Sequence, residues 1–86
     1  MNIICVYDLS GTKVTKAMNI LRKYLFHIQN SVFQGTLTES KFQKLQKELS
    51  ALDLNKDEQI LFLFTYRDSD IYQKSIGREI KKRNII

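Results

Sequence analysis

Two unbroken apolar runs, residues 3–7 and 60–64, constrain the fold of this 86-residue chain more than any other feature. Both are rich in β-branched or aromatic residues, as strands are. A strand with one wet face alternates apolar and polar side chains, and neither run alternates. We therefore expect both runs to be central strands of a sheet, buried on both of its faces. Neither run is long enough to span a membrane.

The segments around these runs predict two helices and a hairpin. Residues 12–25 place their apolar side chains on one side of a helix. Thr38 is a good helix cap followed by an acid and an apolar stripe, so a second helix begins there and ends at the turn of residues 55–57. Residues 26–37 are β-prone and can hold two short strands, with the position of the turn left open. Residues 58–66 form the fourth strand.

The resulting order, β-α-β-β-α-β, is typical of an α+β fold of the ferredoxin-like type, with both helices on one face of the sheet. The chain has no proline, repeat or linker, so residues 1–78 are interpreted as a single domain. Residues 71–76 predict one more strand, for which the four core strands leave no obvious place. We expect this strand to be exchanged onto the partner of a homodimer, the alternative being a frayed end. Residues 79–86 are a basic tail that can be disordered.

The composition indicates a small domain that gains stability by self-association. A chain of this length buries only about 60–65% of the surface that its unfolded form exposes. Its one cysteine, Cys5, lies inside the first apolar run, so neither a disulfide within the chain nor a zinc set is expected. A reducing, cytoplasmic location follows. The N-terminus lacks the basic region and the uninterrupted apolar core of a signal peptide.

The net charge of +5 is unevenly distributed. Residues 12–25 contain four basic side chains and no acid, and residues 78–86 contain four basic side chains and one acid. Two basic patches favour a polyanion such as nucleic acid as the partner. The alternative is a solvated face, which is what most charged runs are. The candidate phosphate-binding residues of the first patch are Lys13, Lys16, Arg22 and Lys23.

Asp8 is the candidate metal ligand. It closes the first apolar run, directly before the turn at Ser10-Gly11, and it is the only acid in the first 38 residues. An acid at the end of a buried strand lies at the edge of the sheet, where ligands can reach it. Mg²⁺ is bound by one or two carboxylates together with phosphate oxygens, so this acid among lysines suggests Mg²⁺ and a phosphate. The alternative is that Asp8 only caps the turn.

Three motifs along the chain carry a family resemblance. They are Tyr7-Asp8, the stretch His-Ile-Gln-Asn-Ser-Val-Phe-Gln-Gly at residues 27–35, and Ser-Ile-Gly at residues 75–77. In this order they resemble the small CRISPR-associated family Cas-two, and the resemblance covers almost the whole chain. It implies a ferredoxin-like homodimer whose last strand completes the partner's sheet. It also implies that the two copies of Asp8 face each other across the two-fold axis and can hold a magnesium ion.

The resemblance further implies an activity and partners. Members of the family have been described as metal-dependent endonucleases that act on RNA or DNA. The family is also the central scaffold of the integrase complex formed with Cas-one, which inserts new spacers into the CRISPR array. The expected partners are therefore a second copy, the Cas-one subunit, double-stranded DNA and, as a further candidate, single-stranded RNA. The expected catalytic positions are Asp8, Tyr7, Ser31 and Phe33.

The chain departs from the family pattern in its basic residues. Members proposed to be nucleases often have an arginine before the Ile-Gln pair, where this chain has His27. Histidine can donate to phosphate but is mostly neutral at pH 7. The arginines that those members carry early in the first helix are represented by Lys13 and Lys16. Two alternatives to an adaptation nuclease follow, a non-catalytic DNA-binding scaffold and a toxin-like ribonuclease of the VapD kind.

Overall fold

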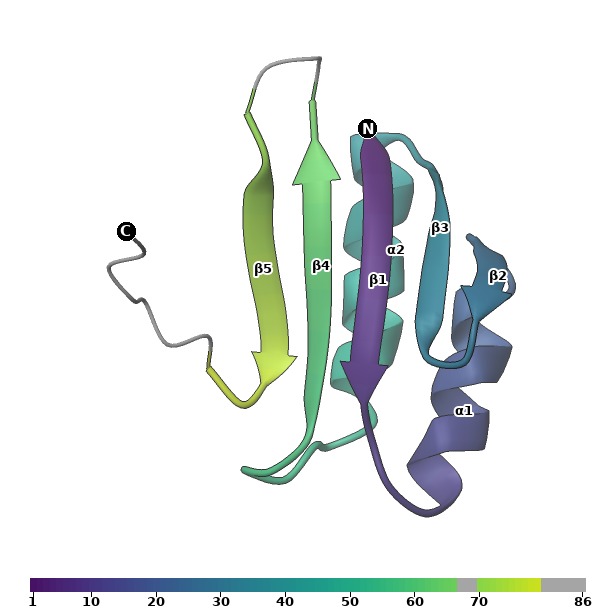
Figure 1. Ribbon diagram of the computed structural model, residues 1–86, viewed down its shortest axis with the longest axis vertical. Helices are drawn as coiled ribbons and strands as arrows, with labels where there is room; N and C mark the ends of the chain where they lie inside the picture. Colours follow the sequence, from purple (N-terminus) through teal and green to yellow (C-terminus); the bar gives the residue numbers. More distant parts are fainter. Residues whose placement is uncertain (67–69, 80–86) are drawn as a thin grey trace.

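The computed structural model describes residues 1–66 and 70–79 of the chain. They form two layers, a five-stranded sheet and two helices that cover one of its faces (Figure 1). The predicted tail, residues 79–86, lies outside these ranges except for Glu79. In chain order the elements are β1 (Asn2–Asp8), α1 (Thr12–Leu21), β2 (Phe26–Gln29), β3 (Val32–Thr36), α2 (Glu39–Ser50), β4 (Gln59–Thr65) and β5 (Tyr72–Gly77).

The sheet has the order β2-β3-β1-β4-β5, and all of its strand pairs are antiparallel. The first four strands have the ferredoxin-like arrangement, so the predicted α+β fold class is confirmed. β1 is the middle strand of the five, with Cys5 opposite Phe33 of β3 and Phe62 of β4. The turn that the sequence left open lies at Asn30 and Ser31, where Asn30 has a φ of +35°.

β5 pairs with β4 of its own chain, from Gln59 opposite Gly77 to Phe64 opposite Tyr72. The prediction that this strand has no place in its own sheet is therefore wrong, and its exchange onto the partner of a homodimer stays a prediction. The ferredoxin-like order leaves the outer edge of β4 unpaired, and an unpaired edge is a template for another strand. Strands that follow each other along a chain usually pair with each other, and β5 does so here.

Both helices begin where the sequence predicts and end earlier than predicted, α2 at Ser50 rather than at the turn of residues 55–57. α1 ends at Leu21, four residues before the predicted end, and the chain continues in turns to Leu25. The predicted cap of α2 is confirmed, because Thr38 Oγ1 accepts a hydrogen bond from the Lys41 amide at 3.2 Å. Among the residues that the structure describes, no helix is long and apolar enough to cross a membrane.

The core lies between the helices and one face of the sheet. The largest side chains that are fully buried there include Phe33, Phe62, Ile3, Leu21, Leu45, Leu49 and Ile60. Burial alternates along β4, so every second residue of the apolar run is only half-buried. The prediction that both runs are buried on both faces is therefore wrong for a single chain. Both helices cover the same face, and no element of the described chain covers the other.

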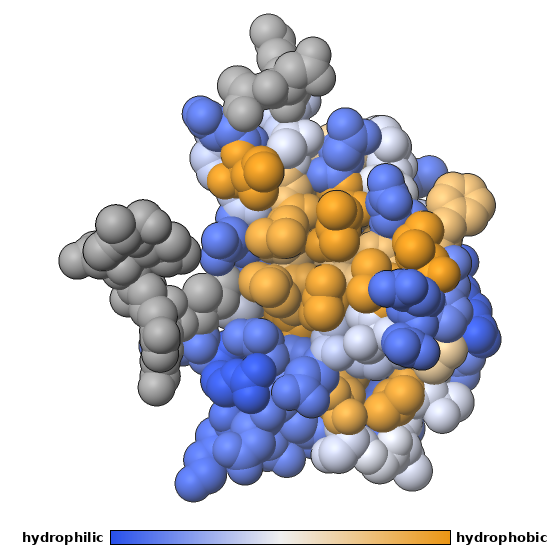
Figure 2. Space-filling view, in the orientation of Figure 1, coloured by the Kyte–Doolittle hydropathy of each residue, from blue (hydrophilic) through white to orange (hydrophobic). Residues whose placement is uncertain are grey.

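The uncovered face of the sheet is apolar. We call it the open face and define it by Ile4 and Val6 of β1 and Leu61 and Leu63 of β4. Ile4 is 40% exposed, and the other three are half-buried. Figure 2, which looks onto this side of the sheet, shows apolar side chains gathered over its middle and polar ones toward the end where β1 terminates. The two runs thus lack alternation because both faces of the strands carry apolar side chains.

Candidate nucleic-acid and metal site at the end of β1

Asp8 is the last residue of β1, and its side chain is 70% exposed. It lies two residues beyond Val6, so strand alternation places it on the open face, at the polar end of the apolar patch. Its partner in β4 is Gln59. The chain leaves the strand through Gly11, which has a φ of +62° and so favours glycine. Asp8 is thus an accessible carboxylate at the end of the strand, as the sequence predicts, and it lies at the edge of an apolar surface.

Arg78, directly after β5, forms an ion pair with Asp8, with 3.6 Å between Nη2 and Asp8 Oδ2. Sequence reasoning placed Arg78 only in a basic tail, because the pairing of β5 with β4 was not foreseen. This pairing sets Gly77 opposite Gln59, and Gln59 is also opposite Asp8. The signal in the sequence was the Ser-Ile-Gly motif of residues 75–77, which immediately precedes Arg78.

Glu58 is a buried carboxylate that fixes the loop after Asp8. It accepts hydrogen bonds from the Ser10 amide and hydroxyl at 3.1 Å each, from Lys13 Nζ at 2.7 Å and from the Asn55 amide at 3.1 Å. The hydrogen bond from Lys13, followed by those from the two amides, lowers the pKa of Glu58 to about 2. Sequence reasoning missed this residue, whose only signal is an acid just before the second apolar run.

Two of the predicted phosphate-binding lysines have partners within the chain. Lys13 Nζ donates to Glu58 and to the carbonyl oxygen of Asp53 at 2.9 Å. Lys23 pairs with Glu48, which also accepts a hydrogen bond from the Tyr24 hydroxyl, and these two bonds lower the pKa of Glu48. Among the described residues, Lys13 and Lys23 have carboxylate partners, which leaves Lys16 and Arg22 as the exposed basic residues of this segment without an ion pair.

Tyr7 and Phe33 point into the core and away from the carboxylate of Asp8. Tyr7 is 7% exposed, Phe33 is fully buried, and their ring centroids are 6.3 Å apart. The Tyr7 hydroxyl donates to the carbonyl oxygen of Asn30 at 3.4 Å, and burial raises the pKa of Tyr7. The structure therefore does not bring the rings of Tyr7 and Phe33 to the carboxylate of Asp8, and the catalytic role of Asp8, Tyr7, Ser31 and Phe33 stays a prediction. Neighbouring strand residues face opposite sides of the sheet, and a buried ring cannot contact a substrate.

The β2–β3 hairpin brings Ser31 and His27 to the same end of the sheet as Asp8. The carbonyl oxygen of Ser31 accepts a hydrogen bond from the Tyr7 amide at 3.1 Å. His27 is exposed, its ring stacks on Phe33 with centroids 4.6 Å apart, and its Nε2 lies 2.7 Å from the carbonyl oxygen of Asn30. A carbonyl oxygen only accepts hydrogen bonds, so Nε2 of His27 is the donor in this contact. That N–H is therefore not available to a phosphate in this conformation.

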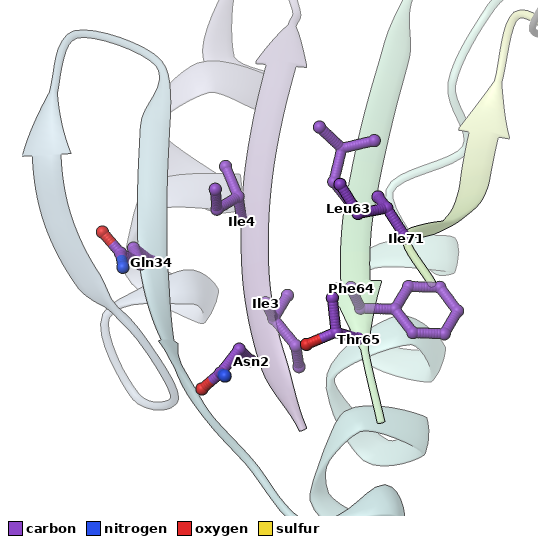
Figure 3. A pocket seen from close by; sticks show the side chains of 8 residues that line it. All are labelled: Asn2, Ile3, Ile4, Gln34, Leu63, Phe64, Thr65 and Ile71. Atoms are coloured by element: carbon purple, nitrogen blue, oxygen red, sulfur yellow. The ribbon is translucent and has the colours of Figure 1, made fainter. Parts of the chain in front are cut away.

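Within one chain, Asp8 alone offers few ligand atoms to a metal ion. Among the described residues, no group of three or more His, Cys, Asp or Glu side chains is placed to hold one. The hollow on the open face lies at the opposite end of β1, has a volume of about 160 Å³ and is lined mainly by apolar residues such as Ile4, Leu63 and Ile71 (Figure 3). This hollow therefore belongs to the apolar open face, and the candidate metal ligand Asp8 lies at the other end of the strand.

Comparison with known proteins decides the family. A family model described as "CRISPR associated protein Cas2" matches residues 1–76. The chain belongs to the Cas2 family. It is 37% identical to a "CRISPR-associated endoribonuclease Cas2" from Dictyoglomus turgidum over 87 residues, which cover 100% of this chain and 99% of that protein. It is 42% identical to a protein of the same description from Thermotoga maritima over 62 residues, 72% of this chain and 71% of that one.

A solved structure described as "Crystal structure of cas2" has the same fold. It superimposes with a TM-score of 0.60 at 23% sequence identity, and the match covers 100% of this chain and 85% of that one. The resemblance to the Cas2 family that the sequence motifs indicate is thus confirmed.

Proposed function

We propose that the protein is a homodimeric nucleic-acid-binding protein of CRISPR adaptation, in which the two Asp8 carboxylates hold a divalent cation and support hydrolysis of phosphodiester bonds. The observation that carries this proposal is the position of Asp8, exposed at the polar end of an apolar open face. A surface of this kind is suited to a second copy, which would bring a second carboxylate. The description of its relatives as CRISPR-associated endoribonucleases supports the reaction class.

The open face supports the dimer. A contiguous apolar patch on a small domain marks an interaction site, because burying apolar surface contributes about 25 cal/mol per Å². A small domain also gains more from such burial than a large one, because it buries less of its own surface on folding. A two-fold interface uses the same patch on both subunits, and a residue meets its own counterpart only where it lies near the axis. The proposal therefore places the axis close to Asp8 at the rim of the patch, so that Asp8 meets Asp8 of the partner subunit.

The cation would be held by Asp8 and Asp8 of the partner subunit, with phosphate oxygens of the nucleic acid completing the set. This fits Mg²⁺, which keeps several waters and is commonly bound by one or two carboxylates and substrate phosphates. When bound there, the ion would supply Lewis-acid polarisation of the phosphate and a more acidic bound water. The chain itself contributes the orientation of Asp8, through the Glu58 hydrogen bonds that fix the following loop.

Lys16 and Arg22 are the residues proposed to contact the phosphate backbone. Both are exposed on α1 or directly after it, whereas Lys13 and Lys23 have carboxylate partners. Contacts of lysine and arginine with phosphates carry no sequence information, so binding should be largely independent of sequence. The dimer would present two such pairs of residues, which suits a duplex lying across both subunits.

Cleavage is tested by comparing the parent with Asp8→Asn on RNA and on duplex DNA, with and without Mg²⁺. The change removes the charge and keeps the shape, so Mg²⁺-dependent cleavage should fall steeply while folding and dimerisation are kept. Asp53→Asn is the matched control. Asp53 has a φ of +55°, a conformation that asparagine tolerates equally well, and its side chain is exposed elsewhere on the surface. Equal cleavage by the parent and Asp8→Asn would contradict a catalytic role of Asp8.

A non-catalytic scaffold that binds DNA and the integrase subunit is the second candidate. The observation that favours it is the small number of metal ligands at Asp8. Within one chain, the charged neighbour of Asp8 is the guanidinium of Arg78, which is not a metal ligand. Spacer acquisition in cells that carry Asp8→Asn separates the two candidates. Normal acquisition by this strain would favour the scaffold, and loss of acquisition with intact protein levels would favour the enzyme.

A further inference from the structure

The C-terminal end of β5 is fixed against the start of β4. Gly77 has a φ of +87°, and a Cβ atom at this position would lie 2.3 Å from the carbonyl oxygen of Glu58. The amide of Arg78 donates to the same oxygen at 2.7 Å. Gln59 Nε2 in turn donates to the carbonyl oxygen of Arg78 at 2.8 Å. The backbone of Arg78 is therefore held by two hydrogen bonds next to a close approach that only glycine permits.

The side chain of Arg78 extends from this fixed backbone toward Asp8. Its Nη1 donates to the carbonyl oxygen of Asp57 at 3.2 Å, and its Nη2 lies 3.6 Å from Asp8 Oδ2. These contacts use a minority of the five N–H donors of a guanidinium. The side chain is 47% exposed, so the remaining donors are accessible from solvent.

An exposed ion pair of this kind is weak, because water screens both charges. A phosphate offers a guanidinium two parallel charge-assisted hydrogen bonds, which are stronger. We propose that Arg78 is a phosphate-binding residue of the Asp8 site, and that Asp8 holds its guanidinium until a phosphate of the nucleic acid replaces the carboxylate. This inference rests on the proposed function only in taking nucleic acid as the ligand.

The proposal predicts that Asp8 and Arg78 are coupled in binding. Asp8→Asn removes the competitor for the guanidinium, so it should tighten binding more when Arg78 is present than when it is replaced. The test is a double-mutant cycle with the parent, Asp8→Asn, Arg78→Gln and the double variant. Binding to a short DNA duplex is measured by fluorescence anisotropy over a range of salt concentrations. The buffer contains EDTA, so neither cleavage nor a cation enters the measurement.

Lys74→Gln is the matched control, because it removes the same charge from the strand that precedes Arg78, on the other face of the sheet. Arg78→Lys keeps the charge but removes the two-pronged geometry, and circular dichroism verifies the fold of every variant. We expect Arg78→Gln to lower the salt slope by about 0.9 for each phosphate that is no longer neutralised, and Lys74→Gln to leave it unchanged. Arg78→Lys should give an intermediate affinity. The coupling between Asp8 and Arg78 should amount to about two- to fivefold in affinity, as expected for an exposed pair.

Two results would overturn the proposal. One is an Arg78→Gln variant that binds as Lys74→Gln does. The other is an Asp8→Asn change that tightens binding equally in both backgrounds, as independent charges would. Either result would leave the proposed function standing if the parent binds the duplex and its Mg²⁺-dependent cleavage needs Asp8. The proposed function itself would be contradicted if the parent did not cleave, or if Asp8→Asn cleaved as fast as the parent.

Discussion

Replacing Gly77 with alanine should separate β5 from the start of β4, because two costs arise at this position. The φ of +87° is unfavourable for any residue with a Cβ atom. The new Cβ would also lie 2.3 Å from the Glu58 carbonyl oxygen and 3.0 Å from Leu54 Cδ1. The closer of these neighbours is a backbone atom, so the chain itself must move to relieve the contact.

The size of the effect follows from a comparison with Gly11. Gly11 also has a positive φ, of +62°, but a Cβ atom there would meet nothing within 4 Å. Gly11→Ala should therefore cost only the backbone strain, about 1–3 kcal/mol. Gly77→Ala should cost a similar strain and, in addition, about 1–3 kcal/mol for the forced contact, as overpacking does.

Urea unfolding of both variants at one protein concentration measures this difference. Concentration must be fixed because self-association adds to the apparent stability. We expect a lower unfolding midpoint for Gly77→Ala than for Gly11→Ala, with an unchanged m-value. If Gly77→Ala were no more destabilising than Gly11→Ala, the end of β5 would not be seated on the Glu58 carbonyl. The intramolecular pairing of β5 would then be in doubt.

Three further predictions concern the dimer, the nucleic acid and the buried acid. Leu63→Glu on the open face should be monomeric by light scattering, whereas the control Gln43→Glu on the exposed side of α2 should remain dimeric. A Leu63→Glu variant that is still a dimer would rule out this interface. Lys16→Ala should lower the salt slope of duplex binding by about 0.9 for each phosphate that Lys16 neutralises, and so by up to about 2 for a dimer. Lys23→Ala should change the slope less, because Lys23 is paired with Glu48. Glu58, with its pKa lowered from 4.5 to about 2, contributes stability above pH 4.5 that is lost as the pH falls through 2, so Glu58→Gln should flatten the acid limb of a stability–pH profile.

The fold was predictable where local signals and tertiary structure agree. The apolar runs of β1 and β4, the Thr38 cap and the turn acid Asp8 all lie where the sequence indicates. The prediction that both faces of these strands are buried within the chain was wrong. An unbroken apolar run does not reveal whether the same chain covers its second face. The half-buried Leu61 and Leu63 show that no described residue of this chain fully covers that face.

The surroundings of Asp8 were less predictable, because they depend on contacts between distant parts of the chain. Lys13 is separated from Glu58 by 45 residues, and nothing local marks the two as partners. Arg78 reaches Asp8 only because β5 takes the free edge of β4. Tyr7 next to Asp8 illustrates a further limit, since adjacent residues in a motif can face opposite sides of a strand.

The proposed meeting of two Asp8 carboxylates across a two-fold axis is tested most directly by cross-linking an Asp8→Cys variant with a short bismaleimide. The natural Cys5 is fully buried and burial raises its pKa to about 12, so it should not react. Lys44→Cys, on the exposed side of α2, is the control. At concentrations where light scattering detects dimers, Asp8→Cys should form a covalent dimer rapidly and Lys44→Cys should not. Cross-linking of Asp8→Cys that is no faster than that of Lys44→Cys would contradict the shared site.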